Sequence, residues 1–481
     1  MRIGLDFGTT NSGAALFDGR RVHLFPLDPA GQPSTVVRST LYITRDHQVS
    51  IGRQAINSYY RQNSGRPIKL VRQYVGELEQ VYSDGLTVVE DVFARVDELS
   101  PGRLLRSLKS ELSGSYNGTT LFGRYYELEE LIAIYLRQIR QRVEAEMGQK
   151  VSGVVLGRPV NFVGGADTAA NQRAEERLRE AAGRAGFRQV DFELEPVAAA
   201  LHYELIAGQP QNVLVFDFGG GTLDVTVMHV GGSAERRIFA TGGVGIAGDA
   251  FDRRIVDVLL LDHLGRNSTI RLGAHGKTWG DVCEPPGAVQ HWAGQSNDDV
   301  VPFPSQFTEA LLNWQTILQL NRPETLHFFR QAQASGSHPA RIRALESLVV
   351  NDEGVRLFDE VERAKIVLSA ACFAVIQLKR EDLNIWQPIT RSQFEALIAR
   401  ETGRIEECVL GTLARSGLEP HQINAVVRTG GSAQIPGFIQ MLERLFGPDK
   451  VVLSEVFSGV TSGLAIRAAS GQKDLIAQHE V

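Results

Sequence analysis

The sequence predicts an α/β protein made of two lobes, each a mixed β-sheet with flanking helices. Two observations lead to this expectation. Apolar segments of strand length alternate with segments of helical periodicity, and one glycine-rich strand–turn–strand pattern occurs twice. The composition agrees, because the 481 residues are 43% hydrophobic and 22% charged, as in ordinary globular proteins.

The repeated pattern is the most informative feature of the chain. Its first copy, residues 2–17, runs from an apolar strand through Asp6-Phe7-Gly8-Thr9-Thr10-Asn11 into a second apolar strand. Its second copy, residues 213–230, has Asp217-Phe218-Gly219-Gly220-Gly221-Thr222-Leu223-Asp224 at the same point. Each copy predicts a β-hairpin with a glycine-rich turn. Two similar halves would then each present one loop to a shared cleft.

The remaining elements divide the chain into two expected lobes. We expect helices over 127–146, 168–186 and 355–371, another starting near 249, and strands over 151–156 and 426–428. The first lobe is expected over 1–208 and is rejoined by 459–481. The second is expected over 209–458, with an enlarged outer subdomain at about 252–350. Residues 77–120, which look polar and irregular, and residues 262–345 are interpreted as insertions.

Charge and composition argue against several classes of protein. Lys plus Arg number 50 and Asp plus Glu 56, so the net charge of −6 disfavours a dedicated nucleic-acid binder. No apolar run approaches the roughly 18 residues of a membrane span. Three cysteines (Cys283, Cys372 and Cys408) are too scattered for a disulfide framework. We therefore expect a reduced, soluble, cytoplasmic protein.

The two glycine-rich turns suit a polyphosphate. Glycines leave backbone N–H groups open to a close anion, and threonine hydroxyls add further donors. Asp6 and Asp217 precede the turns, and two converging carboxylates suit a hydrated Mg²⁺. The chain has no GxxxxGK[ST] loop of the Walker type. The alternative, an ordinary hairpin turn, would explain one copy better than two copies in the same frame.

On these residues the chain resembles the actin-like ATPases, and more closely the ATPase domain of the DnaK-type 70-kDa heat-shock chaperones. Asp6 to Ser12 and Asp217 to Asp224 are similar to the two phosphate signatures of that superfold. Five further segments resemble family motifs in the family's order: 157–162, 195–200, 248–252, 362–369 and 430–436. The resemblance implies an actin-like ATPase fold, with two lobes around a nucleotide cleft.

The resemblance also implies a role for each matched residue. Asp6 and Asp217 would hold Mg²⁺ largely through water, and Glu195, Thr222 and Asp224 would position the attacking water. The phosphate-binding residues would be Gly8, Thr9, Thr10, Asn11, Gly219, Gly220, Gly221 and Thr222. The nucleoside would be bound by Glu362, Lys365 and Ser369 and by the last loop, Gly430, Gly431 and Ser432. Taken without the family, the spacing of Glu362, Lys365 and Ser369 favours an ordinary solvent-exposed helix face over a binding site.

The family also places a lysine near the γ-phosphate, and two residues compete for this role. Lys109 supplies a true lysine, whereas Arg72 fits by chain length; we favour Lys109. The two arginines that sandwich adenine in the family are replaced by Ile366 and Gln434, which predicts weaker or less base-selective binding. No peptide-binding domain is recognised after the ATPase motifs.

We therefore expect an ATP-binding switch that hydrolyses ATP slowly to ADP with Mg²⁺, and a chaperone by resemblance. Partners would be protein clients or co-chaperones that meet the outer subdomain, not nucleic acid or membrane. One alternative is a non-catalytic nucleotide-gated scaffold or filament protein. A sugar kinase is another, although its Gly-Asp segment would precede the second loop and here Gly248-Asp249 follows it. A zinc site of His275, Cys283 and His291 lacks the paired spacing of structural zinc.

Overall fold

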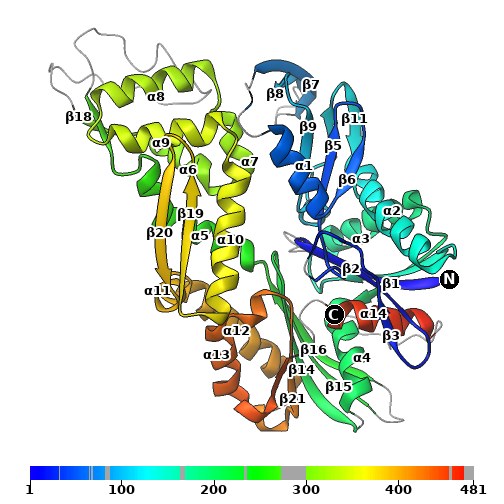
Figure 1. Cartoon of the computed structure of the whole chain (residues 1–481). Helices are drawn as coiled ribbons and strands as arrows, with labels where there is room; N and C mark the ends of the chain where they lie inside the picture. The colour runs from blue at the N-terminus through cyan, green and yellow to red at the C-terminus, as the bar shows by residue number, and fades with distance from the viewer. Residues whose placement is uncertain are drawn as a thin grey trace. The chain divides into compact units, whose positions relative to one another are not determined.

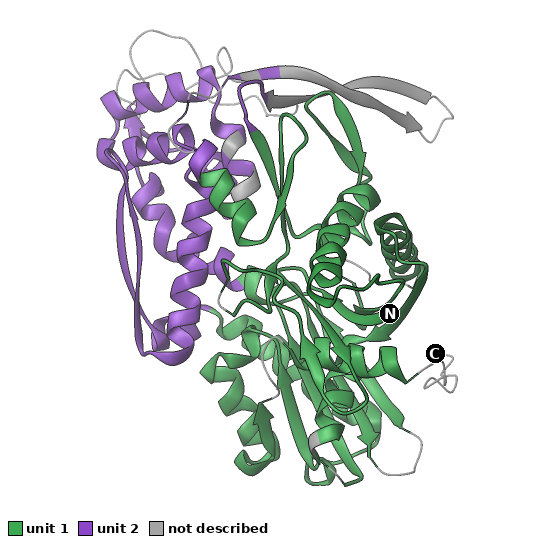
Figure 2. Ribbon diagram, turned by 45° about the vertical axis from the view of Figure 1, so that its right-hand side comes forward, with its two compact units in different colours: residues 1–60, 102–250, 398–481 green, residues 61–101, 251–397 purple. Residues whose placement is uncertain are grey.

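The structure is a computed structural model of the chain. It describes residues 1–31, 33–63, 66, 69–81, 87–162, 168–207, 209–231, 236–271, 300–453 and 458–470. The chain forms two compact units (Figure 2): unit 1 has residues 1–60, 102–250 and 398–481, and unit 2 has residues 61–101 and 251–397. Both units combine helices with β-strands (Figure 1), so the predicted α/β class is confirmed.

The first sheet of unit 1 carries the first copy of the repeat. Its strand order is β13-β12-β1-β2-β3, with β4 also paired to β2. The bounds are β1 Arg2–Phe7, β2 Asn11–Phe17, β3 Val22–Leu24, β4 Val37–Arg38, β12 Gly153–Arg158 and β13 Gln189–Leu194. β1 pairs in parallel with β12 and antiparallel with β2. Helix α14 (Gly459–Ala469) approaches β1 so closely that a Cβ at Gly4 would overlap the backbone of Ala465.

The second sheet of unit 1 carries the second copy. Its order is β16-β15-β14-β21-β22, with bounds β14 Gln211–Phe218, β15 Leu223–Val230, β16 Arg237–Val244, β21 Ala425–Thr429 and β22 Val451–Leu453. β14 and β21 are parallel, and their residues Val213, Val215, Ala425 and Val427 form one core with α4 (Glu195–Ala207) and α14. Such buried strands read as continuous apolar runs in the sequence.

The other elements of unit 1 surround these sheets. The smaller sheets contain β5 Thr40–Thr44, β6 Val49–Ile51, β9 Gly102–Arg106, β10 Gly118–Leu121 and β11 Arg124–Glu127. The helices are α2 Leu128–Met147, α3 Thr168–Ala185, α12 Ala399–Ser416 and α13 Pro436–Phe446. Helices α1 Arg53–Asn63 and α5 Gly248–Ile255 each run from residues of unit 1 into residues of unit 2. The predicted helices over 127–146 and 168–186 and the helix near 249 are confirmed.

Among its described residues, unit 2 contains mainly helices, together with three pairs of β-strands. Its helices are α6 Ser305–Glu309, α7 Trp314–Ile317, α8 Pro323–Ser335, α9 Pro339–Val350, α10 Gly354–Ala370 and α11 Arg391–Leu397. Its strands are β7 Leu70–Val81, β8 Thr87–Asp97, β17 Thr269–Arg271, β18 Val300–Pro302, β19 Phe373–Lys379 and β20 Asn384–Thr390. The predicted helix over 355–371 is α10, which lies along the β19–β20 hairpin (Figure 1).

The expectation that residues 77–120 are irregular is wrong. This stretch holds the end of β7, the strands β8 and β9, the short 3-10 helix η1 Leu108–Glu111 and β10. Segments such as Thr87-Val88-Val89 and Val92-Phe93 are rich in β-branched and aromatic residues, which favour strands despite the polar neighbours.

Among the described residues, no helix is long and apolar enough to cross a membrane. The histidines and cysteine of the zinc alternative lie outside the described residues.

Candidate functional site

The first glycine-rich turn joins β1 to β2 and is tied down by Ser39. The two strands pair Asp6 with Gly13 and Phe7 with Ser12. The Ser39 hydroxyl donates to the carbonyl of Gly8 at 2.6 Å, and its backbone N–H donates to the carbonyl of Thr10 at 2.8 Å. These bonds occupy carbonyl groups of the turn. Its conformation is therefore fixed from the carbonyl side.

The second turn joins β14 to β15 and is fixed in the same way. Asp217 pairs with Asp224 across the hairpin, and Gly219 N–H donates to the Thr222 carbonyl at 3.2 Å. The Gly219 carbonyl accepts from the Ser432 hydroxyl at 2.6 Å, and the Gly220 carbonyl accepts from Asp249 N–H at 2.9 Å. Once more the carbonyl groups of a glycine-rich turn are bonded to neighbouring segments.

The two turns touch at Gly220. A Cβ atom at this position would overlap the Thr10 hydroxyl, so the first and second copies of the repeat meet only because the residue is glycine. The structure therefore brings together, within unit 1, the two loops that the repeat singled out.

Replacing Gly220 by alanine is expected to lower the free energy of unfolding by about 1–3 kcal/mol, because the added methyl group must displace Thr10. Urea titration of the full chain would measure this change. Gly183→Ala is the matched control, since a Cβ there meets no atom within 4 Å. Equal stability of the Gly220 variant and the wild type would contradict the close approach of the two loops.

Four carboxylates and one lysine lie beside these turns. The Nζ of Lys109, in η1, donates to Oε1 of Glu195 at 2.5 Å, and only 7% and 13% of these side chains are exposed. Glu195 is the first residue of α4. The charges of Asp6 and Asp224 also act on Lys109. Burial by itself would lower the pKa of Lys109, but these three negative charges outweigh it and the pKa is raised.

The carboxylates carry more negative charge than Lys109 offsets. Burial, with the charge of Glu195 as the next contribution, raises the pKa of Asp6 to about 7 and that of Asp224 also to about 7. The pKa of Asp217 is raised for the same two reasons. Such values indicate a site that would gain from a bound cation.

The carboxylate set fits a hydrated Mg²⁺, which needs few protein ligands because it keeps most of its waters. Asp6 and Asp217 stand at the ends of β1 and β14, just before the two turns, so they lie beside the donors that would face a phosphate. Within the described residues, no group of three or more His, Cys, Asp or Glu side chains is arranged to hold a metal ion.

Asp224 is oriented by two hydrogen bonds. Its Oδ1 accepts from Val160 N–H at 3.0 Å, and its Oδ2 accepts from the Thr222 hydroxyl at 3.1 Å. The carboxylate is only 2% exposed. Thr222 and Asp224 thus form one rigid pair at the end of the second turn.

The third predicted loop follows β21. Gly430 has φ +86°, and a Cβ there would overlap the Phe218 carbonyl, so this position requires glycine. The next residues lead into the 3-10 helix η8 (Ser432–Gln434), from which Ser432 reaches Gly219. Gly430, Gly431 and Ser432 therefore join the two glycine-rich turns in unit 1.

The three helix residues predicted to bind the nucleoside lie in unit 2, on α10. Lys365 forms an ion pair with Asp252 at 2.7 Å, and the Ser369 hydroxyl donates to the Lys365 carbonyl at 3.3 Å. Glu362 lies one turn before them. On the same helix Ile366 is 60% exposed, an unusual position for a large apolar side chain.

Of the two candidates for the γ-phosphate cation, Lys109 lies in the carboxylate cluster. Arg72 is on β7 in unit 2, and its side chain lies outside the described residues. Sequence reasoning missed Ser39, which fixes the first turn, and Arg428, a buried cation just before the third loop. Arg428 had a readable signal, a charged residue within the apolar run of a buried strand.

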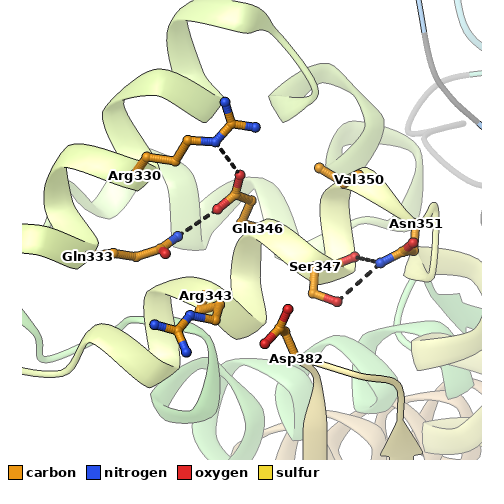
Figure 3. Close-up of a pocket in the computed structure, with 8 residues that line it drawn as sticks. All are labelled: Arg330, Gln333, Arg343, Glu346, Ser347, Val350, Asn351 and Asp382. Carbon is orange, nitrogen blue, oxygen red and sulfur yellow. Dashed lines mark hydrogen bonds and ion pairs between the residues drawn. The ribbon is translucent and has the colours of Figure 1, made fainter.

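A polar pocket of about 410 Å³ lies in unit 2 between α8, α9 and the β19–β20 turn. Figure 3 shows Glu346 between Arg330 and Gln333, whose side chains donate to it at 2.9 and 2.6 Å. Asn351 donates to the Ser347 hydroxyl at 3.1 Å. None of the residues predicted from the sequence lines this pocket.

Comparison with known proteins gives a family match over most of the chain. Residues 2–282 and 350–475 match the family described as Hsp70 protein. The chain is 25% identical to the chaperone protein DnaK of Trichormus variabilis, over 96% of this chain and 54% of the relative. It is 24% identical to the chaperone protein DnaK of Thermus thermophilus, over 96% of this chain and 61% of the relative. The chain thus spans little more than half the length of these relatives.

Proposed function

The chain belongs to the Hsp70 protein family, and from this premise we propose that it is a nucleotide switch that binds ATP and hydrolyses it slowly. Membership confirms the DnaK-type resemblance and the actin-like ATPase fold expected from the sequence. The observation that carries the proposal is the meeting of two glycine-rich turns beside Lys109 and four carboxylates in unit 1.

Phosphoryl transfer to water depends mainly on positioning and charge. The N–H groups and hydroxyls of the two turns bind the β- and γ-phosphates, since their carbonyls are already bonded elsewhere. Lys109 places positive charge at the γ-phosphate. Mg²⁺, when bound by Asp6 and Asp217 through water, supplies the remaining positive charge.

The attacking water is held by Glu195 and Asp224. Glu195 is paired with Lys109, and Asp224 is fixed by Thr222, so both carboxylates have defined positions before the substrate arrives. A carboxylate that accepts a hydrogen bond from water orients the nucleophile without any covalent step. Positioning of the water without a covalent intermediate suits slow turnover, which a switch requires.

The family resemblance assigns contacts with the nucleoside to Glu362, Lys365 and Ser369 on α10 of unit 2. It assigns the same role to Gly430, Gly431 and Ser432 of the third loop in unit 1. Ile366 and Gln434 stand where the family has its adenine-stacking arginines, which the sequence resemblance assigns. Apolar contact with Ile366 replaces one stacking interaction, but the cation–π contribution is absent. We propose that the base is held less tightly and less selectively than in a site with two arginines.

We also propose that the protein acts with client proteins or co-chaperones, as its DnaK relatives are named chaperones. The outer helices of unit 2 are the proposed contact surface for these partners.

The division of the chain into lobes over 1–208 and 209–458 stays a prediction.

Thermal unfolding of the chain with and without Mg-ATP, Mg-ADP and Mg-GTP tests the function. A nucleotide at 100 times its dissociation constant should stabilise the fold by roughly 2.7 kcal/mol. We expect the unfolding midpoint to rise with ATP and ADP and, at the same concentration, to rise less with GTP. Incubation with Mg-ATP should also release phosphate slowly.

The Asp6→Asn variant tests the Mg²⁺ assignment separately. Because it removes a proposed Mg²⁺ ligand, it should lose most of the Mg²⁺-dependent part of the rise in unfolding midpoint. No midpoint change with any nucleotide at millimolar concentration, together with no binding by calorimetry, would contradict the proposal. A full shift without phosphate release would indicate a non-catalytic nucleotide-gated scaffold.

A further inference from the structure

Arg428 is a buried cation in the middle of the second sheet of unit 1. Its strand β21 lies between β14 and β22, and the register pairs Arg428 with Phe216 on β14. The side chain is 7% exposed, and the preceding strand residues Val426 and Val427 are fully buried. A guanidinium in such surroundings lowers stability unless it gains strong partners.

Its contacts do not include an ion pair among the described residues. One guanidinium nitrogen, Nη1, donates to the Ala433 carbonyl at 2.6 Å, and the buried Nε has no hydrogen-bond partner in the described structure. Burial lowers the pKa of Arg428, and the opposing effect of the Glu443 charge is smaller. The residue is therefore not explained as half of a salt bridge. Among the described residues, its one hydrogen bond is to the backbone carbonyl of Ala433, directly after the third loop.

That contact lies next to the hydroxyl that links the loops. Ala433 follows Ser432, whose hydroxyl donates to the Gly219 carbonyl at 2.6 Å in the second turn. Ala433 is itself fully buried, and Gly430 at the start of the loop has a positive φ. The loop is thus held at its first residue by backbone conformation and near its end by Arg428.

We propose that Arg428 is a positioning residue for the nucleotide site, which fixes the Ala433 carbonyl and so aims Ser432 at the second phosphate turn. It acts without touching the nucleotide. The inference rests on the proposed function for its effect on binding, but its effect on the loop is independent of any ligand. An apolar side chain would be more stable in this buried position. We therefore attribute the presence of a charged side chain to the hydrogen bond by which it fixes the Ala433 carbonyl.

The test compares Arg428→Met and Arg428→Lys in the full chain. Methionine is of similar length and apolar, so thermal unfolding is expected to show an unchanged or higher midpoint. The dissociation constant of Mg-ADP, measured by calorimetry, is expected to rise roughly tenfold, since the loop loses a charge-assisted hydrogen bond. Lysine keeps a charged donor and should recover part of the affinity. The exposed Arg444, whose side chain is 62% accessible, provides the control Arg444→Met.

A wild-type dissociation constant in both Arg428 variants would overturn the proposal. Ser432→Ala provides a second test, because it removes the next link along the same path. The double variant Arg428→Met/Ser432→Ala should bind Mg-ADP about as weakly as the weaker single variant. Fully additive losses would show that Arg428 does not act through Ser432.

Hydrogen exchange separates this inference from the nucleotide assignment. Without any ligand, amides of residues 430–435 and 219–222 should exchange faster in Arg428→Met than in the wild type, and at wild-type rates in Arg444→Met. Unchanged exchange in Arg428→Met would overturn the proposal even if nucleotide binds. Faster exchange in a chain that binds no nucleotide would support the positioning role while refuting the proposed function.

Discussion

Replacing Lys109 by methionine is expected to reduce ATP turnover by about 10²- to 10³-fold, the usual loss when a charged or polar group that stabilises the transition state is removed. Lys109 is the one cation that the described structure places among four carboxylates, at 2.5 Å from Glu195. Without it, negative charge at the site would repel the γ-phosphate. Phosphate release under saturating Mg-ATP measures the effect.

The same substitution is expected to lower the free energy of unfolding by about 3–5 kcal/mol, because Glu195 is left buried without its partner. The double variant Lys109→Met/Glu195→Gln should regain most of this stability and none of the turnover. Lys379→Met is the control, since Lys379 is exposed at the end of β19, and it should change neither quantity. Normal turnover in Lys109→Met would assign the γ-phosphate cation to another residue, with Arg72 as the remaining candidate.

The sequence was sufficient to predict the loops, because their signal is local. A repeated Asp-Phe-Gly turn with threonines predicts both a β-hairpin and the residues at its turn. The structure has this hairpin, with Asp217 paired to Asp224 across the two strands. Lys109 was harder to predict, because it precedes a glycine in a segment with no regular periodicity. Its position depends on η1, a four-residue 3-10 helix that tertiary packing determines.

The contacts that aim the loops could not be predicted from the sequence. Ser39 lies far along the chain from Gly8, and Ser432 lies still farther from Gly219, so neither hydrogen bond leaves a local pattern. The misjudged stretch 77–120 has a different cause. There, frequent charged residues concealed a strand preference carried by β-branched and aromatic neighbours.

Replacing Asp224 by asparagine is expected to stabilise the ligand-free protein at pH 8 while abolishing most turnover. Burial and the charge of Glu195 disfavour the carboxylate and raise the pKa of Asp224 from its ordinary value of 3.8 to about 7 in the folded protein. Between these two values the folded state keeps a proton that the unfolded state has lost. The folded state therefore loses stability as the pH rises through this window, and the loss is complete above about 7.

Asparagine stays neutral at every pH and can still accept from Val160 and donate to Thr222, so it avoids this loss. The gain over the wild type should be near zero at pH 4 and on the order of 2–4 kcal/mol at pH 8. Urea titrations at both pH values measure it, with the exposed Asp382→Asn as the control. A gain that does not depend on pH would mean that Asp224 titrates normally. A stable but inactive Asp224→Asn protein would show that the Asp224 carboxylate lowers the stability of the fold but is needed for turnover. Its charge would then be required to position the attacking water.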